Sequence, residues 1–289
     1  KIDYKYLIVG VPCFIKSLRL AQNKYPKLKR RIHILVGLIC GQQKSTFFTD
    51  YLSKLANNRD DNLFKVDFRI NDNKDTADNY GHKFYYNKKN GDSYSKSIFW
   101  KDGINKAWKH DYFKLNPCNF CDDIFAETAD VVFGDAWLPE YKQDYKGHTI
   151  MVIRNRSLHQ KISDDLHNSN EVLINPLDIK YAIKSQQGLI DEKRKGILFR
   201  KNIYDKENKW YPKKRKFNLH INLLDKIKFG LKYRLNHISK VSWGEKNNIK
   251  YLLNSTWQLS FLLDILFFII RSINFVKRRF AKLYTIRSN

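Results

Sequence analysis

Two short apolar stretches, Tyr6-Leu7-Ile8-Val9-Gly10-Val11 and His33-Ile34-Leu35-Val36-Gly37-Leu38-Ile39, decide the fold class. Both are rich in β-branched residues, which is typical of short strands buried on both faces. A helix is predicted between them over residues 14–24. A second helix is predicted over residues 45–55, with Ser45 as its cap and apolar residues at i, i+4. The alternation of strand and helix predicts an α/β layer with parallel neighbouring strands.

The rest of the chain adds strands of a second kind and more helix. Two or three antiparallel strands are predicted over residues 64–94, among them 65–70 and 83–86, with a turn at Asn90-Gly91. The apolar spacing predicts a helix over residues 98–113, and short strands are predicted at 129–133 and 149–154. The predicted fold is therefore α/β: a mixed, largely parallel sheet with flanking helices, followed by a basic helical C-terminal extension.

The composition is that of a globular protein. With 289 residues, of which 43% are hydrophobic and 15% aromatic, the chain buries a large core without disulfides. Four cysteines are too few for a disulfide scaffold, and no signal peptide opens the sequence, so we expect a reducing, cytoplasmic location. Because the first residue is Lys1 and a strand follows at once, we expect the natural protein to extend upstream.

Positive charge is concentrated in the last third of the chain. The net charge is +25, and residues 191–289 hold 24 lysines and arginines against 7 acidic residues. This asymmetry favours anionic partners, although solvated basic faces explain it equally well. We expect a domain boundary near Phe199, between a main domain of residues 1–199 and a basic, mainly helical extension of residues 200–289.

One apolar run in the extension bears on the location of the protein. Residues 257–270 are mostly large and apolar and precede the basic cluster Lys277-Arg278-Arg279. Fourteen positions are fewer than the roughly 20 that a membrane span needs. We therefore expect a helix that lies in a membrane interface or packs on a partner, and a protein peripheral to the inner face of the membrane through its basic C-terminus.

The four cysteines are the strongest functional signal. Cys13 and Cys40 each follow a predicted parallel strand, while Cys118 and Cys121 form a tight pair in a loop. Ligand sites of open α/β sheets lie beyond the carboxyl ends of the strands, so the placement predicts one four-thiolate metal site. One pair and two isolated ligands suit an iron-sulfur cluster better than zinc, which usually binds two close pairs. A zinc site and four metal-free core thiols remain as alternatives at this point.

A resemblance to a known family rests on the order of several unusual motifs. Gly10-Val11-Pro12-Cys13, Leu38-Ile39-Cys40-Gly41 and Cys118-Asn119-Phe120-Cys121 are followed by Ala129-Asp130-Val131-Val132-Phe133-Gly134-Asp135-Ala136-Trp137. Residues 146–152 and 185–189 continue the pattern. Over about residues 1–200 the chain resembles the C-terminal domain of the beta subunits of coenzyme F420 hydrogenases and dehydrogenases, and within them a bacterial branch linked to surface-polysaccharide synthesis.

The resemblance implies an iron-sulfur flavoprotein oxidoreductase. It implies that Cys13, Cys40, Cys118 and Cys121 bind a 4Fe-4S cluster, and that electrons pass between a reduced cofactor, FAD and this cluster. The donor would be a redox partner protein, a deazaflavin or a nicotinamide. Without a Gly-x-Gly-x-x-Gly motif the flavin needs another cradle. We expect its contacts at Gly134 and Asp135, and its pyrophosphate at Lys146 and Thr149.

Other chemistries have weaker signals. Among the eight histidines, which show no metal-ligand spacing, His148 is a candidate for a proton relay because it lies in the motif region. A non-catalytic binding protein with a zinc site is one alternative function. A nucleotide-sugar transferase is another, with an Asp-x-Asp-like stretch only at residues 71–73. Aromatic and basic residues alternate over 210–217, yet no nucleic-acid-binding fold accompanies them, so nucleic acid is disfavoured.

Overall fold

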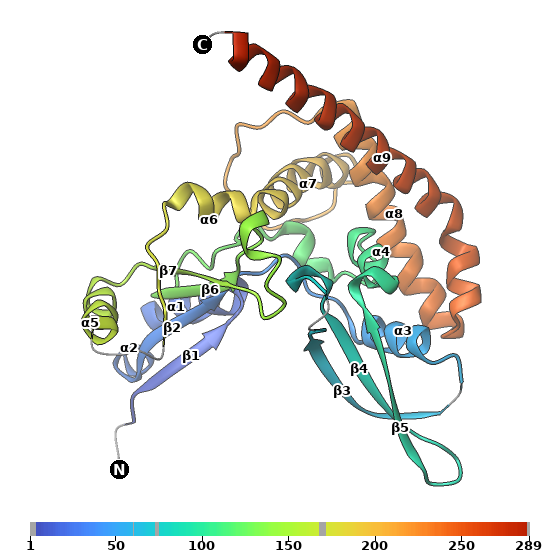
Figure 1. Cartoon of the computed structure of the whole chain (residues 1–289), viewed down its shortest axis with the longest axis horizontal. Helices are drawn as coiled ribbons and strands as arrows, with labels where there is room; N and C mark the ends of the chain where they lie inside the picture. The colour runs from blue at the N-terminus through green and yellow to red at the C-terminus, as the bar shows by residue number, and fades with distance from the viewer. Residues whose placement is uncertain (1–3, 60, 73–74, 168–171, 288–289) are drawn as a thin grey trace.

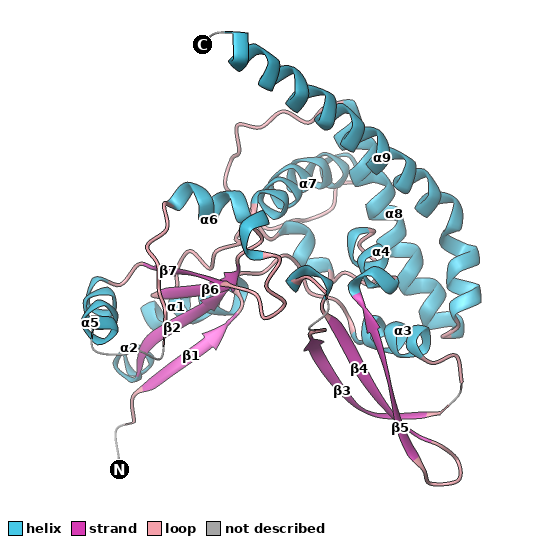
Figure 2. Ribbon diagram, viewed as in Figure 1, coloured by secondary structure: helices cyan, strands magenta, loops and turns pink. Residues whose placement is uncertain are grey.

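A computed structural model describes residues 4–59, 61–72, 75–167 and 172–287. Two sheets lie apart in Figure 1, with most of the C-terminal helices gathered beside the second sheet. The first sheet has the strand order β1-β2-β6-β7, and the second has the order β3-β4-β5. Figure 2 shows helices beside both sheets, with β1 and β3 at open margins. The predicted mixed α/β class with a largely parallel sheet and helical C-terminus is confirmed.

The first sheet forms as predicted from the two opening stretches. Strands β1 (Tyr6–Gly10), β2 (Ile32–Leu38) and β6 (Val131–Asp135) run parallel, and β7 (Thr149–Ile153) pairs antiparallel with β6. The connection from β1 to β2 is α1 (Pro12–Lys24) followed by α2 (Pro26–Arg31), and α5 (Arg156–His167) follows β7. Pro12 occupies the first turn of α1, where a missing N–H costs nothing, so the helix starts before the predicted residue 14.

The expectation that both opening strands are buried on both faces is wrong for β1. Leu35 of β2 is fully buried, whereas Leu7 and Val9 of β1 have 57% and 56% of their surface exposed. The reason is position: β1 is the edge strand of its sheet, and no described residue covers the face to which these two side chains point. β-branched composition alone does not distinguish an edge strand from a central one.

The second sheet is antiparallel, as the sequence predicts, and has three strands. They are β3 (Asn62–Ile70), β4 (Gly81–Asn87) and β5 (Ser93–Phe99), and Asn90 and Gly91 lie in the turn between β4 and β5. A short 3-10 helix, η1 (Ala77–Asn79), precedes β4. The α3 helix (Thr46–Ala56) packs against β5, although the Ser45 hydroxyl makes no capping hydrogen bond.

The helix predicted over residues 98–113 is wrong in most of its length. Strand β5 extends to Phe99, a 3-10 turn η2 covers Trp100–Asp102, and only α4 (Ile104–Lys109) is α-helical. Gly103 has φ 117°, which interrupts the helix, and Asp111 and Phe113 have φ of 59° and 58°. The apolar side chains of this segment nevertheless enter one common core. Their spacing along the sequence therefore resembles that of a helix, although the backbone is irregular.

Helices dominate the C-terminal part. They are α6 (Ile179–Ser185), α7 (Gln187–Lys206), α8 (Leu223–Lys246) and α9 (Ile249–Arg287), and two further 3-10 helices are η3 (Asn116–Phe120) and η4 (Pro139–Tyr141). Residues of α8 and α9 share one buried cluster with α3, β4 and β5, in which Leu235, Trp243, Leu252 and Leu263 are at most 1% exposed. The expected boundary at residue 199 lies inside α7, and the division into two domains stays a prediction.

The last helix is longer than the apolar run in the sequence indicates. Residues Ile249–Lys277 form a continuous helical segment of 29 residues that contains an 18-residue window of mean hydropathy 2.0, long and apolar enough to cross a membrane. The run of 14 positions expected from the sequence is thus only part of this helix, which continues on both sides of residues 257–270. Length and composition alone do not distinguish a membrane span from a helix that packs on a protein.

Candidate functional site

Three predicted site residues leave the same edge of the parallel sheet. Cys13 lies three residues after the end of β1, Cys40 two residues after β2, and Asp135 is the last residue of β6. Because parallel strands end at a common edge, the topology alone brings these residues together. The predicted placement of Cys13 and Cys40 beyond the strand ends is confirmed.

The four thiols lie close enough to act on one another electrostatically. Burial raises the pKa of the Cys40 thiol to about 11, the Lys193 ammonium lowers it, and the charges of the other three cysteines raise it. Cys40, Cys118 and Cys121 are partly buried, whereas Cys13, in the first turn of α1, is exposed. Thus the chain folds so that all three distant cysteine segments meet around Cys40.

The cysteine pair occupies a tight 3-10 turn whose sulfur atoms accept hydrogen bonds. Cys118 lies within η3 and Cys121 caps it. The Gln43 backbone N–H donates to Cys118 Sγ at 3.3 Å, and Lys193 Nζ donates to Cys121 Sγ at 3.3 Å. Both contacts orient the sulfur atoms, as hydrogen bonds to metal-binding side chains do.

Helix α7 covers this turn with two buried cations. Lys193 is 6% exposed and also donates to the Asp123 carbonyl at 2.6 Å. Arg200 is 4% exposed and donates to the Asn119 carbonyl at 2.6 Å, inside the Cys118 to Cys121 turn. Both side chains therefore fix the backbone of the turn and place positive charge beside its sulfur atoms.

The thiols are not gathered into a site for a single metal ion. Among the residues that the structure describes, no group of three or more His, Cys, Asp or Glu side chains is arranged to hold one. In an iron-sulfur cluster each thiolate binds a different iron, so its ligands stand farther apart than those of one zinc ion. The described residues show no single-ion site, and the choice between a cluster and zinc stays a prediction.

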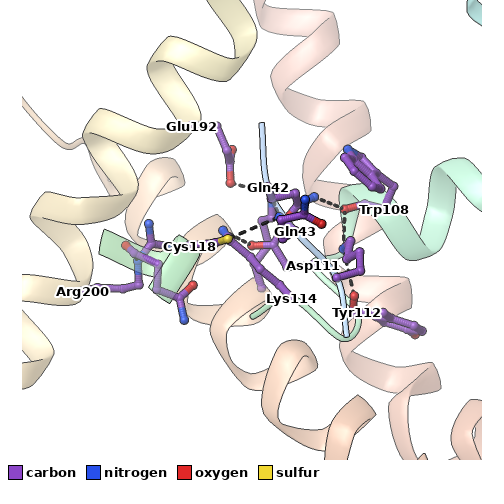
Figure 3. A network of polar contacts seen from close by, with 12 residues as sticks. Gln42, Gln43, Trp108, Asp111, Tyr112, Lys114, Cys118, Glu192 and Arg200 are labelled. Atoms are coloured by element: carbon purple, nitrogen blue, oxygen red, sulfur yellow. Dashed lines mark hydrogen bonds and ion pairs between the residues drawn. The ribbon is translucent and has the colours of Figure 1, made fainter. Parts of the chain in front are cut away.

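A network of buried charges adjoins the cysteines and ties the surrounding elements together (Figure 3). Asp111 is 4% exposed and pairs with Lys114 Nζ at 3.1 Å and Lys232 Nζ at 3.4 Å. Lys232 also contacts Glu192 of α7. Burial alone raises the pKa of Asp111, but the two ammonium groups outweigh it and hold the pKa well below its usual range. These pairs join the loop before η3 to α7 and α8.

Lys44 adds a buried amino group to this network, three residues beyond the Cys40-Gly41 motif. Its Nζ donates to the Tyr112 carbonyl at 2.8 Å, and burial lowers its pKa well below the usual range. The neighbouring Gln42 donates from Nε2 to the Trp108 carbonyl at 3.1 Å, a contact drawn in Figure 3. Burial disfavours the charged form of Lys44, so the positive charge beside the cysteine turn comes from Lys193 and Arg200.

The second part of the site is a small pocket at the Asp135 end of β6. It has a volume of about 50 Å³. Three of the four predicted flavin contacts, Asp135, Lys146 and Thr149, line it, and so does His148. The structure thus brings together residues that belong to β6, to β7 and to the loop between them.

Arg69 is the residue of this pocket that sequence reasoning missed. Its two terminal nitrogens donate to the two oxygens of Asp135 at 2.9 and 3.1 Å, and its guanidinium lies 4.2 Å from the centre of the Tyr80 ring. The Trp137 ring, which stacks on Tyr80, lies 6.0 Å from the guanidinium. Arg69 adopts φ 63° at an irregularity of β3, so a strained backbone aims this side chain across to the other sheet. No sequence motif signals that contact.

Gly134 is placed differently from the other three predicted contacts. The sequence reading put Gly134 and Asp135 after the strand, but both lie within β6 and pair with Ile150 and Thr149. A Cβ atom on Gly134 would lie 2.4 Å from Ile39 Cδ1, so packing against Ile39 requires glycine there. Gly134 does not line the pocket, and its flavin contact stays a prediction.

His148 lies at the rim of the pocket with two neighbours. Its Nε2 is 3.5 Å from Asp144 Oδ2, and its ring packs on Tyr141 at 4.8 Å between centroids. Nearly half of the side chain is exposed, so solvent reaches the ring. This position suits a proton relay, and that role stays a prediction.

Gln186 connects the C-terminal motif block to the pocket. It is 2% exposed, and its Nε2 donates to the Asp135 carbonyl at 2.8 Å. Its Oε1 is buried and has no hydrogen-bond partner among the described residues. Buried amide oxygens are rarely left unpaired, so this atom is available to a donor on a bound molecule.

Comparisons with known proteins identify a matching family and a similar solved structure. Residues 3–179 match the sequence model of a family described as the C terminus of the coenzyme F420 hydrogenase/dehydrogenase beta subunit. No curated protein sequence gives a significant match. A chain in the solved xenon-derivatised F420-reducing NiFe hydrogenase complex of Methanosarcina barkeri is 19% identical, with a TM-score of 0.42.

That match covers 72% of this chain and 65% of the other, so the chain spans less than two thirds of the length of its match. The family match covers more than half of the chain and includes all four cysteines and the Asp135 pocket residues Lys146 and Thr149. The chain therefore belongs to the family of coenzyme F420 hydrogenase/dehydrogenase beta subunits, as a member with its C-terminal domain.

Proposed function

We propose that the protein is an iron-sulfur flavoprotein in which Cys13, Cys40, Cys118 and Cys121 bind a 4Fe-4S cluster. The observation that carries this proposal is the placement of the Cys118–Cys121 turn against Gln43 of the Cys40 loop and Lys193 of α7, with the Cys13 thiol near enough to influence Cys40. When bound, a cluster exchanges single electrons at a potential that its surroundings set. The family supports a redox role, because its members are beta subunits of hydrogenases and dehydrogenases.

The residues around the thiols perform two tasks in this proposal. Lys193, Arg200 and the Gln43 N–H supply positive charge and hydrogen bonds, which stabilise anionic sulfur. Leu189 of α7 lies against Gly41, where a Cβ atom would approach its side chain to 3.0 Å, so α7 closes tightly over the Cys40 loop. The charges thus offset the negative thiolates, and the helix limits access of water to them.

The pocket at Asp135 is the proposed position of the flavin nucleotide. Arg69, Lys142 and Lys146 line it together with His148, which gives it the cationic character that a pyrophosphate requires. Tyr80 and Trp137 offer aromatic faces beside Arg69. A volume of about 50 Å³ holds only a few atoms, so FAD binding requires the Arg69–Asp135 pair to open. That pair is half exposed, and its opening costs little.

Metal analysis of anaerobically purified protein tests the cluster. We expect about four iron and four sulfide per chain, with the broad visible absorbance of a cluster and an EPR signal after reduction. Cys121→Ser should lose most of the iron. Ser93→Ala, on the β5 hairpin away from the sheet edge, is the control and should keep it.

Two results would contradict the proposal that the cysteines bind an iron-sulfur cluster. Zinc in place of iron would show a structural thiolate site and favour the non-catalytic binding protein. The second result is unaltered protein that contains no metal, together with a Cys118→Ser variant that folds normally. It would show that the thiols only pack in the fold. A nucleotide-sugar transferase would then be the alternative to test, by transfer activity in the same variant.

Flavin binding is measured separately, by titration of the protein with FAD followed by fluorescence. We expect Asp135→Asn and Lys146→Gln each to weaken binding about 10-fold, because each loses one charged hydrogen bond to the nucleotide. Lys88→Gln in the β4–β5 turn is the control. Equal affinity of all four proteins would place the flavin elsewhere.

The remaining parts of the proposal concern the cellular setting. We infer that a partner redox protein, a deazaflavin or a nicotinamide supplies the electrons and that the protein works in the cytoplasm. A role in surface-polysaccharide synthesis stays a prediction from the resemblance to the bacterial branch of the family. Electron transfer from candidate donors to the anaerobic protein, followed at the visible absorbance, identifies the donor class.

A further inference from the structure

Helix α9 has two faces that differ in their environment. The side chains that face the protein recur every three or four residues and are at most 6% exposed; they are Leu252, Thr256, Ser260, Leu263 and Leu266. The opposite face exposes large apolar side chains. They are Trp257, Phe261, Leu262, Ile265, Phe268, Ile269, Ile273, Phe275, Val276 and Phe280. We call these ten residues the outer face of α9.

The outer face is unusually apolar for a surface. Trp257, Phe261, Phe268 and Phe275 each expose 59% or more of their surface. Between Trp257 and Phe280 the helix extends over roughly 35 Å at 1.5 Å per residue. The described residues leave this face uncovered, as α9 forms the outer margin of the molecule in Figure 1. A continuous exposed apolar strip of this size marks a binding surface.

The charges near the strip identify the partner. In residues 249–289 the only acidic residue is Asp264, and its carboxylate is paired with Lys106 at 2.9 Å on the side that faces the protein. Beyond Arg271 the sequence holds only basic charges, with exposed Lys277 and Arg279 at the end of the strip. An apolar helix face that ends in a basic cluster, with a tryptophan on the apolar side, is complementary to an anionic lipid surface.

Polar contacts on the inner face show how deeply the helix is able to enter the lipid. Tyr112 Oη contacts the hydroxyls of Thr256 at 2.9 Å and Ser260 at 2.6 Å, and His110 Nε2 lies 2.8 Å from Asp264. A transmembrane position would separate these groups from their partners and place them in hydrocarbon, which is costly. A position in the interface keeps every one of them.

We propose that the outer face of α9 lies in the headgroup region of an anionic membrane and holds the protein there as a peripheral protein. The apolar side chains enter the lipid while Lys277 and Arg279 contact acidic headgroups. This surface is independent of the cysteines and the Asp135 pocket, so the proposal stands or fails separately from the redox function.

Flotation of the full chain with vesicles tests the proposal. We expect binding to phosphatidylcholine vesicles that contain phosphatidylglycerol to be at least about 10-fold tighter than to phosphatidylcholine alone, and to weaken as salt is added. The double variant Phe261→Glu and Phe268→Glu should reduce binding at least about 10-fold. Trp210→Glu, which changes an 83% exposed apolar residue outside α9, is the matched control and should bind as the unaltered chain does.

Three results would overturn the proposal. The first is equal or absent binding to the two kinds of vesicle, which would favour a protein partner for this face. The second is protein that sodium carbonate fails to release from vesicles, which would show a membrane-spanning α9. The third is a lipid-free dimer, seen by light scattering, that Phe268→Glu dissociates, which would show that a second copy covers the face. The comparison of the two kinds of vesicle uses the unaltered chain. It therefore tests the proposal even if the double variant does not fold.

Discussion

The cysteine edge and the Asp135 pocket end neighbouring strands of one sheet, yet they are built in opposite ways. At the cysteines, Asp111, Lys114, Lys193, Arg200 and Lys232 are at most 6% exposed and hold the turn through ion pairs and carbonyl contacts. At the pocket, the Arg69–Asp135 pair has side chains 48% and 39% exposed. One region is locked by buried charge, whereas the other is closed by a contact that water competes for.

The difference fits the two proposed tasks. Cluster ligands must keep fixed positions, and a buried ion-pair network whose disruption is costly keeps them there. A site that admits a nucleotide must open, and an exposed pair contributes little free energy and separates easily. The backbone strain at Asp111 and Phe113 is tolerated because the buried network determines that segment from several sides.

Removal of one charge from the buried network should have the largest effect. Asp111→Asn leaves Lys114 and Lys232 without their shared carboxylate, so we expect the free energy of unfolding to fall by about 3–5 kcal/mol. Urea denaturation measures it. Asp67→Asn, which breaks an exposed contact to Lys65 on β3, is the control and should change stability little. Similar losses in both variants would show that the cysteine edge is not the more rigid region.

A methyl group at Gly134 should have the next largest effect. Because its Cβ would lie 2.4 Å from Ile39 Cδ1, Gly134→Ala should destabilise the protein by about 1–3 kcal/mol. Gly188→Ala, in the first turn of α7 with nothing within 4 Å of a Cβ, should leave the protein as stable or stabilise it slightly. Thermal melts of the apo-protein compare the two. An unaltered melting temperature for Gly134→Ala would contradict the packing role.

Acid should weaken the pocket side of the molecule through His82. Burial, and next the Arg69 charge, lower the pKa of His82 from 6.5 to about 4. Above about pH 6.5 the ring is neutral in both states, whereas below it the unfolded chain binds a proton that the folded chain does not. The stability is therefore complete above about pH 6.5 and falls toward pH 4, with a loss of about 2 kcal/mol at about pH 5.

Replacement of the ring removes this dependence. In His82→Phe the difference in unfolding free energy between about pH 7 and about pH 5 should shrink by that amount, about 2 kcal/mol. Urea titrations at the two pH values measure it. The buried His110, whose pKa burial likewise lowers to about 4, keeps its own contribution in both proteins and serves as the internal reference. An equal pH dependence in the variant would mean that His82 is solvated.

The exposed ion pair should matter least to stability. Arg69→Gln breaks the bidentate contact to Asp135, and we expect the unfolding free energy to change by less than about 1 kcal/mol because the pair is well solvated. Chemical denaturation compares this variant with Asp111→Asn. A loss as large as that of the buried network would show that the pocket is as rigid as the cysteine edge.

Much of the fold was predictable because local patterns and long-range contacts agree in it. The β-branched runs at β1 and β2, the Asn90-Gly91 turn and the cysteines at strand ends all follow from residue type and spacing. The helix predicted over 98–113 failed because Gly103 and the positive φ of Asp111 and Phe113 break the period. Arg69 was missed because its contact to Asp135 joins two sheets, and no local signal marks such a pair.

The sequence by itself determined the parallel strands and the placement of cysteines at their ends, since both depend on local residue pattern. Tertiary structure alone decided that α7 brings Lys193 and Arg200 to the cysteine turn. It also decided that the Ile39 side chain packs against Gly134. It also decided which half of α9 is exposed. These features arise from packing between segments far apart in the chain, where burial and charge pairing set the free energy and residue spacing carries no information.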